Sequence, residues 1–215
     1  MVDFMDDGKR ANVRRAALEV FLRFGYRKVT MDDIARDAGM SRPALYLVFP
    51  NKEAVFRDVV RAGLDDLIEQ IEEGLPKRHT LAEQLAHVFE VSTIRSFDLV
   101  SRAPAANELM GASFDFAKDL FDRYEQRRAE ILVRLIRSAV PRPDALRPSA
   151  AARARVMIAA AHGFKSAAKD LRDMEAFVSD MILMTVAGLP IAERPSRPKS
   201  RPRSAGKPKR TPRGV

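Results

Sequence analysis

The feature that most constrains this chain is a succession of segments in which apolar side chains recur with the 3.6-residue period of an α-helix. Proline and glycine separate these segments, and the residue types that favour β-strands are few. The pattern predicts an all-α protein. We expect helices over residues 9–24, 31–38, 42–47, 51–74, 81–97, 104–110, 114–140, 150–169 and 174–187. Ser149 and Asp173 stand where helix N-caps are expected.

The net charge of +9 is unevenly distributed along the 215 residues. Residues 194–215 hold nine basic residues and no acidic one, so residues 1–193 are neutral overall. Within that neutral part, residues 9–52 carry ten basic and four acidic residues, a local charge of +6. A basic block on a neutral body is typical of a surface that binds nucleic acid. The basic C-terminal segment also holds five prolines, and this composition predicts disorder.

Composition also argues against several classes of protein. The absence of cysteine excludes disulfides, thiolate metal sites and thiol nucleophiles. His79, His87 and His162 lie in different expected helices without a carboxylate at metal-ligand spacing, so we interpret all three as structural. No nucleophile with a nearby base is recognisable. We therefore predict no catalytic residue, no metal site and no cofactor, and a protein that is not an enzyme.

Neither a signal peptide nor a membrane span is expected. The first eight residues are acidic, whereas a signal peptide begins with basic residues and continues with apolar ones. The longest weakly polar stretch, residues 181–192, is shorter than the roughly 20 residues that a membrane helix needs. We expect a soluble cytoplasmic protein with no membrane partner.

One short region carries the most specific signal. Thr30 and Asp33 form a capping-box pattern at the start of one short helix. Gly39 permits a left-handed turn, and Ser41 can cap a second short helix in which Pro43 falls in the first turn. Two helices joined by such a turn form a helix-turn-helix, which places its second helix in the DNA major groove. The alternative is an ordinary helical hairpin, but the local charge of +6 favours DNA binding.

This region resembles the N-terminal domain of the TetR family of transcriptional repressors. The resemblance rests on a set of residues whose order and spacing are those of the family: Ala17, Phe21, Gly25, Tyr26, Val29, Thr30, Asp33, Ile34, Ala35, Ala38, Gly39, Ser41, Leu45, Tyr46, Phe49, Lys52 and Glu53. It covers about 45 residues closely. It implies a three-helix DNA-binding domain followed by a helical domain that binds ligand and forms a dimer.

The resemblance also implies roles for individual residues. Thr30 and Ser41 are expected to place helix N-termini against DNA phosphates, and Tyr46 and Lys52 to contact phosphates. Arg42, Pro43 and Ala44 are expected to face the bases. The sequence departs from the family at Leu47 and Val48, where aromatic or polar residues are usual. Leu47 can instead contact a thymine methyl group.

These observations predict four regions: a flexible N-terminus over residues 1–8, a DNA-binding domain over 9–52, a ligand-binding and dimerisation domain over 53–192, and a disordered basic tail over 193–215. The candidate ligand-binding residues are aromatic residues and methionines of the second half: Phe89, Phe97, Met110, Phe114, Tyr124 and Met157. Ordinary core packing is the alternative for each of them. The candidate dimer-interface residues form two stripes: Ala154, Met157, Ile158, Ala161, Phe177, Met181 and Met184. Packing within one chain is the alternative for these.

The leading functional hypothesis is a repressor that binds a palindromic operator in double-stranded DNA as a homodimer and is released by a small-molecule effector. The alternative is an effector-independent or architectural DNA-binding protein, aided by the basic tail. A helical domain without a cavity would favour that alternative. A third possibility, an enzyme on a helical fold, lacks any supporting residue pattern.

Overall fold

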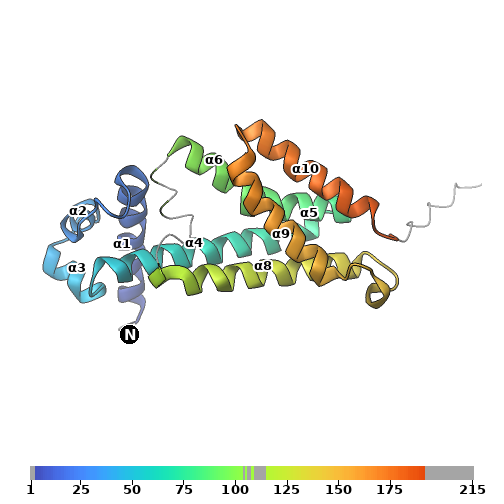
Figure 1. The fold of residues 1–215 in the computed structure, drawn as a ribbon. Helices are drawn as coiled ribbons and strands as arrows, with labels where there is room; N and C mark the ends of the chain where they lie inside the picture. The colour runs from blue at the N-terminus through green and yellow to red at the C-terminus, as the bar shows by residue number, and fades with distance from the viewer. Residues whose placement is uncertain (1–2, 104, 106–107, 109–114, 192–215) are drawn as a thin grey trace, which may run out of the picture.

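The structure is a computed structural model that describes residues 3–103, 105, 108 and 115–191, and every regular element in those residues is a helix (Figure 1). This confirms the predicted all-α class. The helices form an elongated molecule with the first three helices at one end (Figure 1). The predicted helix over residues 104–110 and the predicted tail lie largely or wholly outside the described residues. In the described part of the chain, no helix combines the length and apolar character needed to cross a membrane.

The first three helices are α1 (Asp3–Phe24), α2 (Met31–Asp37) and α3 (Arg42–Val48). α1 begins at Asp3, earlier than the predicted start at residue 9. Gly25 ends α1 with φ +82°, and Gly39 turns the chain between α2 and α3 with φ +65°. Both angles lie in the left-handed region that glycine adopts at little cost. The predicted helix-turn-helix is therefore present.

Side-chain caps define where α2 and α3 begin. The Thr30 hydroxyl accepts a hydrogen bond from the Asp33 amide, and the Asp33 carboxylate accepts one from the Thr30 amide. This reciprocal capping box was predicted from the sequence. Ser41 caps α3 by accepting a hydrogen bond from the Ala44 amide at 3.3 Å. Local sequence thus sets both helix starts.

A long helix, α4 (Lys52–Gly74), connects this end of the molecule to the rest. Asn51 caps α4 through its side chain, which accepts a hydrogen bond from the Ala54 amide at 2.8 Å. Val55 and Phe56, both 0% exposed, lie in the hydrophobic core shared with α1, α2 and α3. Ile68 and Ile71 lie in a second core built from the later helices. One rigid element therefore belongs to both cores.

The next segment differs from the single helix predicted over residues 81–97. After η1 (Leu75–Lys77), the chain forms α5 (Leu81–Phe89), a π-helical turn η2 (Glu90–Ile94) and α6 (Arg95–Arg102). The π turn inserts one extra residue per turn, so the Arg95 amide donates to the Glu90 carbonyl. The insertion changes which side chains of α6 face the interior. Such turns often accompany functional sites.

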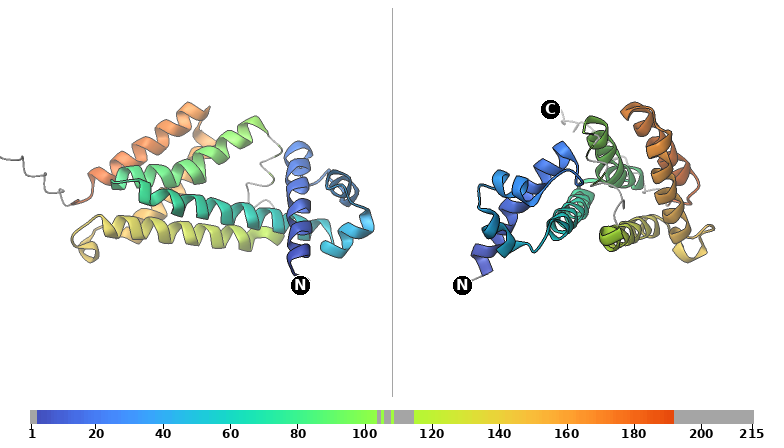
Figure 2. Two further views of the ribbon diagram at one scale, coloured as in Figure 1. Left: turned by 180° about the vertical axis from the view of Figure 1, so that it is seen from behind. Right: turned by 60° about the vertical axis from the view of Figure 1, so that its left-hand side comes forward.

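The last helices are η4 (Asp115–Ala117), α8 (Lys118–Ser138), η5 (Pro143–Ala145), α9 (Ala150–Ala167) and α10 (Leu171–Ala187). α8 runs alongside α4 and also packs on α9, while α10 packs on α5 and α9 (Figures 1 and 2).

The start of α10 differs from the prediction. It begins at Leu171 rather than at residue 174, and its N-cap is Asp170 rather than Asp173. Asp170 accepts a hydrogen bond from the Asp173 amide at 2.9 Å, while the Asp173 carboxylate accepts one from the Lys169 amide at 3.3 Å. Two acidic residues three positions apart both suit a helix start, and the earlier one is the cap here. The predicted cap at Ser149 is confirmed.

Candidate functional site

The exposed surface of α3 is the first candidate site. Ser41, Arg42, Pro43 and Tyr46 are exposed, and Ala44 is half-buried. Leu47 is 89% exposed, although burial of a leucine side chain is energetically favourable. The buried face of the same helix holds Leu45, at 0% exposure. α3 therefore presents to solvent the residues that the sequence assigned to DNA.

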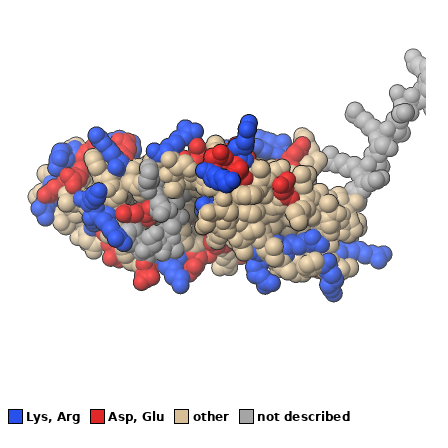
Figure 3. Space-filling view, turned by 45° about the horizontal axis from the view of Figure 1, so that its top comes forward, with Lys and Arg blue, Asp and Glu red and all other residues tan. Residues whose placement is uncertain are grey.

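Arg42, the predicted base-contacting residue, has a partner in this structure. Its Nε lies 3.2 Å from the Asp32 carboxylate, and its guanidinium lies 5.6 Å from the centre of the Tyr46 ring. Both Arg42 and Asp32 are more than half exposed, so the ion pair is weak and can exchange for another acceptor. Lys and Arg side chains lie over this end of the molecule with acidic residues between them (Figure 3).

Lys52 has a role that its sequence position does not reveal. Its ammonium group donates to the carbonyls of Tyr26 and Val29, each at 2.8 Å, and also contacts the Arg27 carbonyl at 3.5 Å. It also lies 4.4 Å from the centre of the Tyr26 ring. An ammonium has three donors, and here all three point to the loop between α1 and α2. Lys52 thus fixes the loop that orients α2, and its predicted phosphate contact stays a prediction.

The second candidate site is a cavity of about 660 Å³ enclosed by α1, α4, η2, α6, α8 and α9. This volume is typical of cavities that bind small molecules. Its walls are formed by Leu18, Leu22, Val59, Val60, Gly63, Leu64, Leu67, Ser92, Ser96, Phe97, Leu99, Val100, Ser101, Phe121, Asp122, Tyr124, Glu125, Arg128, His162 and Lys165.

Of the predicted ligand-binding residues, some line the cavity and others do not. Phe97 and Tyr124 line the cavity. Phe89 and Met157 do not line it, because they are 0% and 2% exposed within the second core. Met110 and Phe114 lie outside the described residues.

Sequence reasoning missed the polar groups of this cavity. His162, interpreted as structural, lines the cavity and its Nε2 lies 3.1 Å from a carboxylate oxygen of Glu125. The other Glu125 oxygen accepts a hydrogen bond of 2.6 Å from Arg128. Burial alone would raise the pKa of the Glu125 carboxyl, but the His162 hydrogen bond and the Arg128 charge outweigh it and lower that pKa.

A signal for Arg128 was present in the sequence. Leu120, Tyr124, Ile131 and Leu135 are buried on one face of α8, and Arg128 falls on that face four residues after Tyr124. An arginine in such an apolar stripe is buried unless the helix ends or rotates. Its side chain is 2% exposed. The charge was overlooked because surface arginines are common.

The third candidate site is the outer face of α9 and α10. Three of the predicted interface residues, Ala154, Met157 and Ala161, are at most 2% exposed and pack in the core of their own chain. They are therefore unable to contact a second subunit. Ile158, Phe177 and Met181 are partly buried against the same core or against Phe164.

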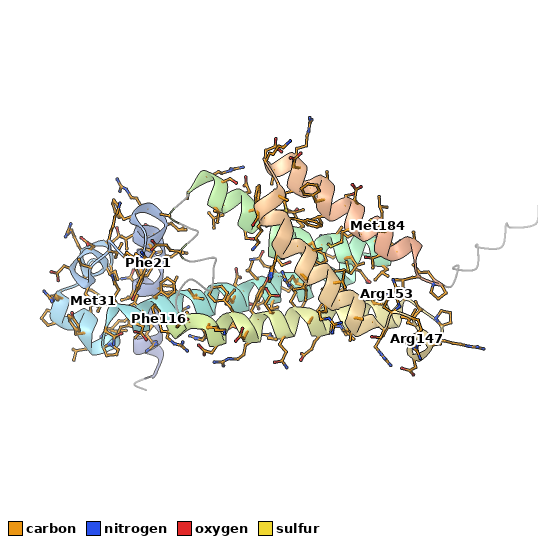
Figure 4. All side chains as sticks on the ribbon, viewed as in Figure 1. Phe21, Met31, Phe116, Arg147, Arg153 and Met184 are labelled. Atoms are coloured by element: carbon orange, nitrogen blue, oxygen red, sulfur yellow. The ribbon has the colours of Figure 1, made fainter. Side chains whose placement is uncertain are left out.

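Met184 alone among the predicted interface residues is strongly exposed, at 76% (Figure 4). Val156 on α9 and Leu183 on α10 are 64% and 61% exposed. Small residues of the same faces, including Ala159, Gly163 and Ala187, are also exposed. The exposed surface of the two helices thus carries apolar side chains that, apart from Met184, differ from the predicted interface residues.

Residues 13–59 match the sequence profile described as "Bacterial regulatory proteins, tetR family". This segment is a TetR-family segment. The matched range spans α1 from Val13, the helix-turn-helix and the first turns of α4. It therefore contains every predicted DNA-contacting residue.

Comparison with other proteins adds relatives of this chain. The "Fatty acid metabolism regulator protein" of Bacillus subtilis is 34% identical over 73 residues, 34% of this chain and 38% of the relative. An "Uncharacterized HTH-type transcriptional regulator YfiR" of the same species is 29% identical over 86 residues, 40% of this chain and 42% of the relative. The chain thus spans about two fifths of the length of these curated relatives.

Solved structures extend the similarity of fold to most of the chain. A transcriptional regulator from Cytophaga hutchinsonii superposes with a TM-score of 0.67 at 20% identity, covering 85% of this chain and 98% of the other. FadR from Bacillus subtilis, in complex with stearoyl-CoA, gives a TM-score of 0.61 at 19% identity, covering 83% and 98%. At these identities the similarity concerns the fold.

Proposed function

We propose that this protein is a DNA-binding transcriptional regulator of the TetR family that represses its target by binding a palindromic operator as a homodimer, and that a small-molecule effector releases it. The family match supports DNA binding by the segment that includes α3. The exposed residues of α3, Arg42 and Leu47 above all, supply a hydrogen-bond donor for guanine and an apolar contact for a thymine methyl.

One observation carries the effector part of the proposal. The cavity is lined by Leu18 and Leu22 of α1 together with residues of α6, α8 and α9. α1 packs directly against α2 and α3, so a molecule in the cavity contacts the element that supports the helix-turn-helix. A ligand that fits one orientation of α1 better shifts the population toward that orientation. A coupling of about 1–3 kcal/mol suffices for efficient release.

The cavity also supports one of the two functional hypotheses over the other. An effector-independent DNA-binding protein needs no internal space, and a filled core would have favoured it. The cavity of about 660 Å³ favours a ligand-responsive regulator instead. The stearoyl-CoA held by FadR of Bacillus subtilis supports a small-molecule ligand for a helical domain of this shape.

The homodimer is proposed to form through the outer face of α9 and α10. Val156 on α9 and Leu183 and Met184 on α10 are large apolar side chains that are strongly exposed, and exposed apolar patches mark interaction sites. Two helices from each subunit would form a four-helix interface. A two-fold dimer places its two α3 helices about one or more turns of B-DNA apart, roughly 34 Å for one turn.

Selection of duplexes from a random pool, followed by fluorescence anisotropy, tests the DNA-binding function. The full-length protein is expected to enrich a palindromic site. Arg42→Ala is expected to weaken binding to that site by about 1–3 kcal/mol, because a bidentate contact to guanine is lost. Arg134→Ala, a change of an exposed arginine on α8 that pairs with Glu72, is the matched control and is expected to bind normally. Equal affinity of Arg42→Ala and wild type would refute the assignment of Arg42.

A further inference from the structure

Arg128 is the most deeply buried of the charged residues in the cavity wall. Its side chain is 2% exposed, and one Nη atom donates to Glu125 at 2.6 Å. Its Nε–H has no hydrogen-bond partner among the described residues. Arginine offers only donors, so this buried group needs an acceptor. A buried donor without a partner costs free energy that a ligand with a suitable acceptor can recover.

Tyr124 supplies a second donor one helical turn away on α8. Its hydroxyl is buried and faces Ser92 and Arg128 without a hydrogen bond of normal geometry to either. Burial raises the pKa of the Tyr124 hydroxyl, and so the group keeps its proton at neutral pH. The Arg128 guanidinium lies 5.6 Å from the centre of the Tyr124 ring. Two unpartnered donors therefore lie side by side in one wall.

The charged residues around these donors differ in burial and in pairing. Lys165 on α9 lines the cavity, is exposed to solvent, and forms no ion pair with a described residue. Both oxygens of Glu125 are already engaged, by Arg128 and by His162. Asp122, the remaining acidic wall residue, is exposed at the rim. The fully buried Arg128 thus has one charged partner, the half-buried Glu125, and an anionic group of a ligand would supply a second acceptor for its guanidinium.

The ionisable and the purely apolar parts of the cavity wall come from different helices. The wall from α1 and α4 is entirely apolar, with Leu18, Leu22 and Leu64 as examples. The ionisable residues all come from α8 and α9. A ligand that matches both parts must itself have a polar end and an apolar body.

We infer that the effector is a monoanionic amphiphile: a carboxylate that accepts hydrogen bonds from Arg128 Nε and the Tyr124 hydroxyl, with an apolar body lying against α1 and α4. This inference rests on the proposed function of the cavity as the effector site. A carboxylate fits better than a phosphate monoester because it carries one charge and two coplanar oxygens for two neighbouring donors. The apolar body places the ligand against Leu18 and Leu22 of α1.

Three probes with the same ten-carbon chain test the head group: decanoate, decanol and decyltrimethylammonium. Binding to the full-length protein is measured by isothermal titration calorimetry. Decanoate is expected to bind at least about tenfold more tightly than decanol, because charge-assisted hydrogen bonds form only with the carboxylate. The cation is expected to bind most weakly. Equal affinities for decanoate and decanol, tighter binding of the cation, or no binding of decanoate would overturn the inference.

Two variants locate the head group. Arg128→Gln is expected to remove the roughly tenfold preference for decanoate while changing decanol affinity less than about twofold. Arg127→Gln is its matched control, because Arg127 neighbours it on α8, is about half exposed and pairs with Asp65 outside the cavity.

Since Arg128→Gln leaves Glu125 without its partner, Tyr124→Phe provides a second variant that removes only a hydroxyl. It is expected to weaken decanoate binding about threefold to tenfold. Unchanged decanoate affinity in Tyr124→Phe would contradict the proposed position of the head group.

Operator binding, measured separately on the same protein, distinguishes this inference from the proposed function. If decanoate binds as expected but leaves operator affinity unchanged, the head-group assignment stands and the effector function fails. If a neutral or cationic compound binds in the cavity and releases the operator while decanoate does not bind, the effector function stands and the head-group inference fails.

Discussion

Asp58 on α4 is a carboxylate with 6% exposure, held by three arginines. Arg61 and Arg14 donate to it at 2.8 and 2.9 Å, and Arg10 donates at 3.3 Å. Two of these arginines belong to α1, so the cluster joins α1 to α4. Burial alone would raise the pKa of Asp58, but the hydrogen bonds from Arg61, Arg14 and Arg10 outweigh it and lower that pKa.

Replacing this carboxylate tests its contribution to stability. Asp58→Asn is expected to lower the free energy of unfolding by roughly 1–3 kcal/mol, less than for a fully buried pair because the arginines are partly exposed and can rehydrate. Urea titration measures the change, and Glu69→Gln, an exposed acid on the same helix, is the control. Because the folded pKa of Asp58 is lowered, its contribution is present above the unfolded pKa of about 3.9 and is lost as pH falls through the folded value. A difference that grows on acidification would contradict this account.

At the scale of single elements, two glycines allow a comparison, because Gly63 has a helical backbone and Gly39 a left-handed one. Gly63 lies within α4 at the cavity wall, and a Cβ added there meets no atom within 4 Å. Gly63→Ala is therefore expected to stabilise the fold by about 0.5–1 kcal/mol, through helix propensity. Gly39 also has free space, but its φ of +65° strains any other residue, so Gly39→Ala is expected to destabilise by about 1–2 kcal/mol. Urea denaturation midpoints measure the stability change of each variant. If both changes had the same sign, backbone conformation would not determine the effect of the added methyl group.

The elements also show which parts of the structure are predictable from sequence. The starts of α2 and α3 were predictable because Thr30, Asp33 and Ser41 act through hydrogen bonds within one turn. The π turn after α5 was not, because apolar periodicity does not report one inserted residue.

The burial of Arg128 was predictable in principle, because it stands in an apolar stripe of α8. Its position in a cavity wall was not, because the other helices of that wall are far away in the sequence. Stripe residues such as Ala154 were assigned to the dimer because periodicity marks an apolar face without saying what covers it.

At the scale of the whole molecule, the proposed dimer predicts a separable change in assembly. Met184→Lys is expected to convert the protein to a monomer, because it places a charge in an apolar interface, yet the fold should persist since Met184 is 76% exposed. Size-exclusion chromatography with light scattering measures the mass. Leu47→Ser, which changes another strongly exposed apolar residue, on α3, is expected to remain dimeric. A wild-type monomer at micromolar concentration, or a dimeric Met184→Lys, would show that α9 and α10 do not form the interface.

The central claim is that a molecule in the cavity controls operator binding through α1. The most direct measurement is the operator affinity, by fluorescence anisotropy, with and without a saturating concentration of the tightest-binding ten-carbon probe. We predict that the probe weakens operator binding of the wild type by about 5-fold to 150-fold. Gly63→Leu, which fills part of the cavity, is expected to respond less than about twofold. An operator affinity of the wild type that stays unchanged while calorimetry shows the probe bound would contradict the account.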